Sequence, residues 1–309
     1  MRIAIIGAGA MGTLFAGRLA DSGQEILLVE VSLAQIDAIG KHGLRISDEA
    51  GETRHILPIG TADRYVGVVD GLVVFTKGMH TRAAVEACRH LIGTETWALT
   101  VQNGLGNVEA IEASIGRDRI IMGMTNWPAS LVEPGHVQVP GTGEIRIWSA
   151  AGMHSQRLDT ISEMLSQAGL RCVLDPRVEI SIWEKLAFNA AMNSLAAVTN
   201  LTVGQMADRP EARALVFAIL EEALLVAKAR GIDVDAERTR RSVEFAFTHH
   251  RPHKPSMLQD RLAGRAMEID TITGAVAAQA SYCGVAAPVT ATFARLLTLL
   301  DGDTRHSSP

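Results

Sequence analysis

A glycine-rich turn near the N-terminus limits what this chain can fold into. Residues 3–6 form a short apolar run rich in β-branched side chains, which is typical of a buried strand. The segment GAGAMG follows at once, and apolar residues then recur at helical spacing as far as Leu19. In such a strand, turn and helix, unpaired N–H groups and the positive end of the helix dipole face a bound pyrophosphate. We therefore predict a dinucleotide site formed by Gly7, Ala8, Gly9, Ala10, Met11 and Gly12.

Each glycine of this turn has its own role, and an acidic residue follows at a suitable distance. Gly7 permits the tight turn, Gly9 lets the backbone approach a pyrophosphate, and Gly12 lets the helix pack on the strand. A second apolar run at 25–29 ends in Glu30, 18 positions after Gly12. Folds of this kind place the carboxylate that holds a ribose about 20 residues further on. Glu30 is therefore predicted to bind the ribose; the alternative is an ordinary tight turn and a surface acid.

The rest of the first half continues to alternate between strand and helix patterns. Strands are predicted at 72–75, 97–101 and 120–123, a helix at 81–92, and a hairpin at 45–55 that turns at 48–51. This alternation favours an α/β fold with a doubly wound parallel sheet. Ligands bind at the carboxyl ends of such strands, where Lys77 and Asn103 also fall.

The pattern changes in the second half of the chain. Short β segments are expected at 136–139 and 144–148, a helix at 158–168 and a last strand at 170–174, and all later segments have helical periodicity. We therefore predict a dinucleotide-binding domain at 1–176 and an all-α domain at 177–309.

Composition excludes several classes of function. The net charge of −5 is too small to indicate nucleic acid or a membrane surface as partner, and no apolar run approaches the ~18 residues of a spanning helix. Three distant cysteines suit neither a disulfide framework nor a metal site, and Pro252 interrupts the histidines at 249, 250 and 253. We expect a cytoplasmic protein with no metal; its apolar helical half is compatible with a homodimer.

Residues 183–195 carry a polar stripe on an apolar helix. Lys185, Asn189 and Asn193 are four apart, so on a helix each lies about 40° from the last. Polar groups among apolar neighbours need partners. One interpretation is structural, with a solvated lysine and asparagines bonded to neighbouring helices. The other is a lysine that faces a cleft and donates a proton to a carbonyl oxygen, its pKa lowered by burial.

Two later helices have recognisable starting signals. Asp208 is predicted to cap a helix that has Pro210 in its first turn and ends at Gly231. Ser256 and Gln259 have the spacing of a capping box, and a helix start there could also hold a substrate carboxylate.

Glu268 is a candidate acid further along the chain. It follows Asp260 by eight positions, which predicts a similar helix face. The pattern alone fits an exposed charged face as well as a functional group.

The chain resembles the ketopantoate reductases (2-dehydropantoate 2-reductases) nearly from end to end. The similarity lies in six segments that occur in the family's order. They are GAGAMG at 7–12, FTK at 75–77, QNGLG at 102–106, WEKLAFNAAMNSL at 183–195, PSMLQD at 255–260 and MEIDTITG at 267–274.

The resemblance implies a Rossmann domain followed by a helical domain like that of 6-phosphogluconate dehydrogenases. It implies that Lys185 protonates the ketone oxygen and that Glu268 orients the substrate hydroxyl. It also implies that Asn189 and Asn193 contact that hydroxyl, Ser256 the substrate carboxylate, and that Lys77 and Asn103 lie near the nicotinamide ribose and the reacting centre.

The chain differs from typical family members at the residues that distinguish NADPH from NADH. Typical members use NADPH and have an arginine just after the second strand, whereas residues 29–32 read VEVS here. Residues 78–80 also lack a glutamine often present in the family. The carboxylate of Glu30 would repel the 2′-phosphate of NADPH and accept hydrogen bonds from the ribose diol of NADH. Of the two NAD(P)H cofactors, we therefore expect the protein to prefer NADH.

The predicted activity is hydride transfer from NAD(P)H to a small 2-oxo acid, with 2-dehydropantoate giving pantoate as in pantothenate biosynthesis. One alternative is a related reductase or dehydrogenase of another 2-oxo or 3-hydroxy acid, because a fold does not determine a substrate. Another is a dinucleotide-binding sensor without turnover.

Overall fold

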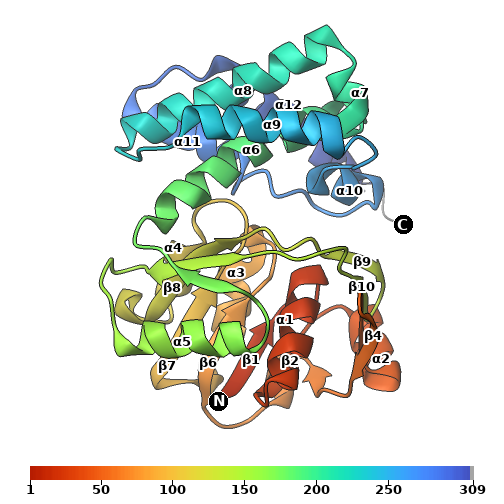
Figure 1. Ribbon diagram of the computed structural model, residues 1–309, viewed down its shortest axis with the longest axis vertical. Coiled ribbons are helices and arrows are strands. Elements are labelled where there is room, and N and C mark those ends of the chain that lie inside the picture. The colour runs from red at the N-terminus through yellow and green to blue at the C-terminus, as the bar shows by residue number, and fades with distance from the viewer. Residues whose placement is uncertain (307–309) are drawn as a thin grey trace. The chain divides into compact units, whose positions relative to one another are not determined.

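The computed structural model describes residues 1–306 and separates into two compact units (Figure 1). The first unit consists of Met1–Gln102 and Gly106–Val178. The second consists of Asn103–Leu105 together with the chain from Glu179 onward. A short loop from the first half of the sequence therefore belongs, by its contacts, to the helical unit.

An eight-stranded sheet forms the centre of the first unit. Its order is β12-β11-β8-β7-β6-β1-β2-β5, and all neighbouring pairs are parallel except β8 with β11. This confirms the predicted α/β fold with a parallel sheet. The strands are β1 (Arg2–Ile6), β2 (Glu25–Val29), β5 (Ile59–Gly60), β6 (Val69–Val74), β7 (Ile92–Thr100), β8 (Ile120–Thr125), β11 (Ile145–Ser149) and β12 (Cys172–Leu174).

Helices cover both faces of this sheet because its strands are apolar on both sides. Ile3 and Ile5 of β1 belong to one core, whereas Ala4 and Ile6 belong to the other, since successive side chains of a strand point to opposite faces. Helices α1 (Ala10–Asp21) and α5 (Gln156–Gln167) pack in the first core, and α3 (Thr81–Ala87) and α4 (Asn107–Glu112) in the second. Helix α2 (Leu33–His42) follows β2.

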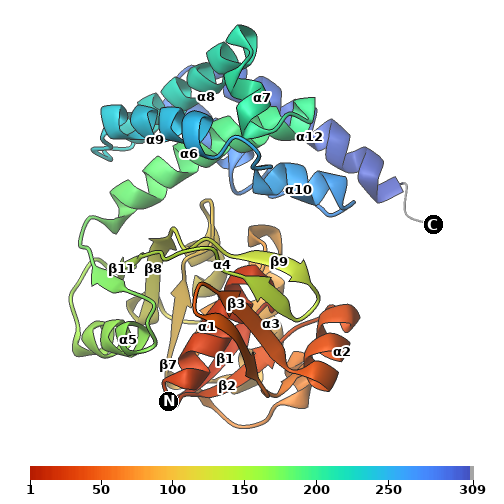
Figure 2. The ribbon, with the colours of Figure 1, turned by 45° about the vertical axis from the view of Figure 1, so that its right-hand side comes forward.

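A small second sheet has the order β4-β3-β10-β9. Its strands are β3 (Leu44–Asp48), β4 (Gly51–His55), β9 (Ser130–Glu133) and β10 (His136–Gln138). β3 and β4 pair antiparallel and form the hairpin predicted at 45–55. Figure 2 shows β3 and β9 beside α1, and buried Ile46 and Val137 share the core of Phe15.

The helix predicted at 81–92 is shorter than its pattern indicates. α3 ends at Ala87, and a 3₁₀ turn, η3 (Arg89–Leu91), leads into β7 at Ile92. The N–H groups of Cys88 and Leu91 donate to carbonyls three residues earlier, those of Val85 and Cys88. This is the hydrogen-bond pattern of a 3₁₀ turn, which ends the α-helix. Cys88 and Leu91 are thereby completely buried. Three further 3₁₀ turns are η1 (Ala62–Arg64), η2 (Gly78–His80) and η4 (Arg117–Arg119).

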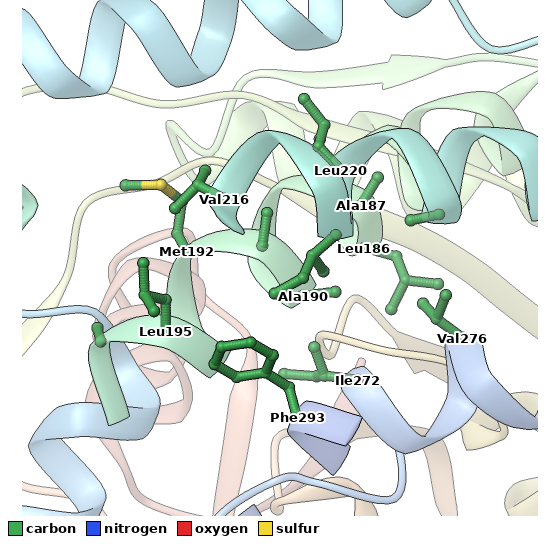
Figure 3. Packing of buried hydrophobic residues seen from close by; sticks show 14 of the residues in the cluster. Leu186, Ala187, Ala190, Met192, Leu195, Val216, Leu220, Ile272, Val276 and Phe293 are labelled. Atoms are coloured by element: carbon green, nitrogen blue, oxygen red, sulfur yellow. The ribbon is translucent and has the colours of Figure 1, made fainter. Parts of the chain in front are cut away.

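The second unit is built around the long helix α6 (Val178–Thr199). In Figure 3, Leu186, Ala190 and Leu195 of α6 lie among apolar side chains of later helices, including Leu220 of α8 and Phe293 of α12. The later helices are α7 (Val203–Ala207), α8 (Pro210–Ala229), α9 (Ala236–His249), α10 (Ser256–Leu262), α11 (Thr273–Cys283) and α12 (Pro288–His306). Among the described helices, none has the length and apolarity required to span a bilayer.

The capping residues predicted for two helices were wrong, although both helices begin close to the predicted positions. Arg209, not Asp208, is the N-cap of α8; Pro210 occupies the first turn as predicted, and Asp208 pairs with Arg251 at 2.7 Å. Likewise Pro255 is the N-cap of α10, and Ser256 is already inside the helix, so it forms no capping box. In both cases the capping side chain binds a distant partner instead, which local spacing does not reveal.

Glu268 does not share a helix with Asp260, contrary to the predicted face. α10 ends at Leu262, and Gly264 adopts a left-handed conformation (φ +65°) that terminates it. Glu268 therefore lies in the irregular segment before α11.

Candidate active site

The turn after β1 has the close contacts that require glycine. Gly7 has φ +97°, and its N–H donates to the Val29 carbonyl at 2.8 Å. A Cβ on Gly12 would lie 1.8 Å from the Gly7 carbonyl oxygen, and one on Gly7 would lie 2.9 Å from the backbone of Phe75. The first and third glycines thus permit strand, turn and helix to touch.

Gly9 differs from its neighbours because it faces open space. It is the N-cap residue of α1, it forms no side-chain cap bond, and a Cβ there would meet nothing within 4 Å. The first N–H groups of a helix have no carbonyl partners within it, so this end offers donors to an anion. The turn therefore fits a pyrophosphate that approaches the backbone at Gly9.

Glu30 lies directly beside the glycine turn. One of its carboxylate oxygens, Oε2, accepts the N–H of Ala8 at 2.7 Å. The other, Oε1, accepts the N–H groups of Val31 and Ser32 at 2.7 and 2.8 Å. These bonds hold a negative charge at the carboxyl end of β2, next to the helix start that would receive phosphate.

Gln102 ties the ends of β6 and β7 together, a role that the sequence reasoning missed. Its Nε2 donates to the Thr76 carbonyl at 2.5 Å and to the Thr81 hydroxyl at 2.9 Å, and its Oε1 accepts from Thr100 at 2.9 Å. The network holds the residue before Lys77, while Asn103 follows Gln102 directly. The signal was available in the sequence, because Gln102 is a polar residue that comes just after a buried strand.

Lys185, Asn189 and Asn193 do occupy one helix, α6. The side chain of Lys185 is partly exposed, yet the protein around it removes enough water to lower the pKa of its ammonium group to about 8. The carboxylate of Glu268 acts in the opposite direction and raises this pKa. The structure thus combines a lysine of lowered basicity with a nearby acid, both within the helical unit.

Asn193 forms the kind of bond between helices that the structural interpretation expected. It is only 3% exposed, and its Oδ1 accepts the Met257 N–H at 3.0 Å and the Ser256 hydroxyl at 3.2 Å. The amide thereby joins α6 to the start of α10 and holds Ser256 in place. Asn189, one turn earlier, is partly buried.

The segment that carries Glu268 is held at several points. The Met267 N–H donates to the buried carboxylate of Asp301 at 2.9 Å. The Thr273 and Ser194 hydroxyls are 2.6 Å apart, which fixes the end of the turn to α6. Glu268 is therefore placed by long-range contacts rather than by a helix of its own.

The predicted residues divide between the two units. Gly7–Gly12, Glu30 and Lys77 lie at the carboxyl ends of strands in the first unit. Lys185, Asn189, Asn193, Ser256 and Glu268 belong to the second unit, and so does Asn103.

Comparison with known proteins identifies relatives over nearly the whole chain. The family model described as ketopantoate reductase PanE/ApbA matches residues 3–152, and the model of its C-terminal part matches 177–301. The 2-dehydropantoate 2-reductase of Streptococcus pyogenes serotype M1 is 30% identical over 97% of this chain and 96% of its own length.

Solved structures agree in fold. A D-mandelate dehydrogenase in complex with NADH and anilino(oxo)acetate has a TM-score of 0.93 at 29% identity, covering 99% of this chain and 100% of that one. The 2-dehydropantoate 2-reductase of Geobacter metallireducens GS-15 has a TM-score of 0.90 at 30% identity, covering 97% and 99%. On the extent of this similarity, the chain belongs to the ketopantoate reductase family.

Proposed function

We propose that this protein reduces 2-dehydropantoate to pantoate with a nicotinamide dinucleotide as hydride donor. One observation carries this proposal: the pKa of Lys185, on the apolar helix α6, is lowered to about 8 by burial. The negative charge of Glu268 lies close enough to act on the same ammonium group. Family membership supports the substrate, and the glycine turn with Glu30 supports the cofactor.

The bound cofactor would supply the hydride, and this chain would supply position and the proton. Lys185 Nζ donates a proton to the ketone oxygen as negative charge develops there, which its pKa near neutrality suits. Glu268 orients the resulting hydroxyl, with Asn189 and the amide of Asn193 beside it. Ser256 contacts the substrate carboxylate once its hydroxyl turns away from Asn193.

Two cofactor-side residues complete the proposal. Lys77 and Asn103 follow the ends of β6 and β7, the edge at which such sheets bind their ligands. We assign them to the nicotinamide ribose and the reacting centre.

A second candidate function keeps this machinery and changes the acid. The solved D-mandelate dehydrogenase, with a TM-score of 0.93, carries NADH and an oxo acid analogue. That similarity favours an NADH-dependent reductase of another 2-oxo acid. A sensor without turnover is less well supported, because a sensor does not require a proton donor such as Lys185.

A substrate panel separates these functions. We expect NADH oxidation, followed by absorbance, to show a higher kcat/KM for 2-dehydropantoate than for benzoylformate or pyruvate. A preference for benzoylformate would favour the second function. Tight NADH binding with no oxidation by any acid would favour the sensor.

The cofactor preference follows from the charge at Glu30. We expect kcat/KM for NADH to exceed that for NADPH by at least about tenfold. Like charges 4 Å apart cost about 1 kcal/mol in water and about 4 kcal/mol near a protein surface. The matched variant Glu30→Gln keeps the size of the side chain and removes its charge, so the preference should shrink through better use of NADPH. A wild-type preference for NADPH would contradict this assignment.

A further inference from the structure

The loop that follows β7 is bound to the helical unit through its backbone. The N–H of Leu105 donates to the carbonyl of Thr271 at 2.8 Å. The Leu105 side chain also packs against the apolar core of that unit. These contacts explain why Asn103–Leu105 group with residues far away in the sequence.

Gly104 makes this contact possible for two separate reasons. Its φ of +85° is a conformation that side chains rarely adopt. A Cβ there would also lie 2.3 Å from the Thr271 carbonyl oxygen and 2.9 Å from Thr271 Cβ. Gly106, two residues later, has a similar φ of +88°, but a Cβ there would meet nothing within 4 Å. Of the two, only Gly104 combines a positive φ with a close approach to another segment of the chain.

Thr271 belongs to the turn that carries Glu268. The Ile272 N–H donates to the Glu268 carbonyl at 3.2 Å, and the Ile272 side chain is buried in the core around α6 (Figure 3). Thr273, the next residue, is fixed to Ser194 of α6. The Thr271 carbonyl is therefore held in register with the helix that bears Lys185.

We propose that the backbone contact of Gly104 and Leu105 with Thr271 is a positioning latch. It holds Asn103 at a fixed place relative to Lys185 and Glu268, so that the loop and the proton donor form one constellation. The inference rests on the proposed function, because it concerns the geometry of that reaction. Gly104 and Thr271 act through Asn103 and Glu268 and are positioning residues.

The decisive comparison is Gly104→Ala with Gly106→Ala. Both variants place a Cβ at a residue with positive φ, but only the Cβ in Gly104→Ala would clash with the backbone of Thr271. We expect Gly104→Ala to lower kcat by about 100-fold, the effect of a misplacement of about 1 Å, and Gly106→Ala to lower it far less. Turnover is to be expressed per NADH-binding site, so that unfolded protein is not counted. In Gly104→Ala the affinity for NADH should fall far less than kcat, because most of the cofactor's contacts are assigned to the glycine turn and Glu30. An equal loss in the two variants would overturn the latch.

A milder change covers the case in which Gly104→Ala fails to fold. Leucic acid in place of Leu105 keeps the side chain and replaces the backbone N–H by an oxygen, which removes the bond to Thr271. We expect a smaller fall in kcat per site with the melting temperature nearly kept. Unchanged turnover in this variant would refute the positioning role.

Amide exchange tests the latch independently of turnover. In the wild type we expect slow exchange at the Leu105 N–H, measured by NMR, and fast exchange in Gly104→Ala. Rapid exchange in the wild type would show that the latch is absent, whatever the substrate. Slow exchange in a protein that reduces no acid would instead retain the contact and refute the proposed function.

Discussion

Replacing Lys185 with methionine is expected to lower kcat for the reduction by about 100- to 10,000-fold, the usual contribution of a positioned general acid. Affinity for NADH should remain nearly unchanged, because the glycine turn and Glu30 belong to the other unit. The measurement is steady-state NADH oxidation with a parallel NADH titration. Lys228→Met, the same change at an exposed lysine of α8, is the control and should be silent. Turnover above a tenth of wild type in Lys185→Met would remove Lys185 from the mechanism.

The pH dependence of the wild type provides an internal check on this role. Burial lowers the Lys185 pKa from 10.5 to about 8. The proposed role as proton donor requires the protonated form. The rate of reduction should therefore be level below pH 8 and fall about tenfold per pH unit above it. In Lys185→Met this inflection should disappear.

The same variant should be at least as stable as the wild type. Because the folded pKa lies below the unfolded one, the unfolded chain binds more protons between about pH 8 and 10.5. The stability that Lys185 contributes is thus lowest below pH 8 and rises as the pH increases through this window. Methionine carries no charge to desolvate, so its advantage in thermal unfolding should be largest near neutral pH and diminish toward pH 10.5.

The second large effect is expected at Gly9. Gly9→Ala should weaken NADH binding by about 100-fold, which corresponds to the loss of one or two charge-assisted hydrogen bonds from backbone N–H groups to the pyrophosphate. The ligand-free protein should keep its stability, because φ −71° and ψ −167° suit alanine and a Cβ meets nothing within 4 Å. NADH fluorescence titration and thermal unfolding measure the two quantities.

Gly12→Ala is the matched contrast to Gly9→Ala. A Cβ at Gly12 would lie 1.8 Å from the Gly7 carbonyl oxygen, so this variant should lose stability even without cofactor. The two glycines are three residues apart, but Gly9 faces open space, whereas Gly12 packs against the backbone of Gly7. Wild-type NADH affinity in Gly9→Ala would show that the pyrophosphate does not approach this turn.

Local patterns in the sequence determined much of this protein. The β1-turn-α1 unit, the alternating strands of the parallel sheet and the hairpin of β3 and β4 all follow from spacing and turn residues. The polar stripe on α6 was also predictable, because helical periodicity alone aligns Lys185 with Asn189. Each of these features depends on residues a few positions apart.

Tertiary structure alone decided how the site is held. Asp208 and Ser256 have the spacing of caps, but they bind Arg251 and Asn193 instead. Glu268 lies in a turn held by contacts with other helices, and Gly104 meets Thr271 across more than 160 positions of sequence. The physical reason is that a carboxylate or hydroxyl can bond equally well to several donors or acceptors, and local spacing does not distinguish among them. Which one it binds depends on chain segments that only the packed core brings together.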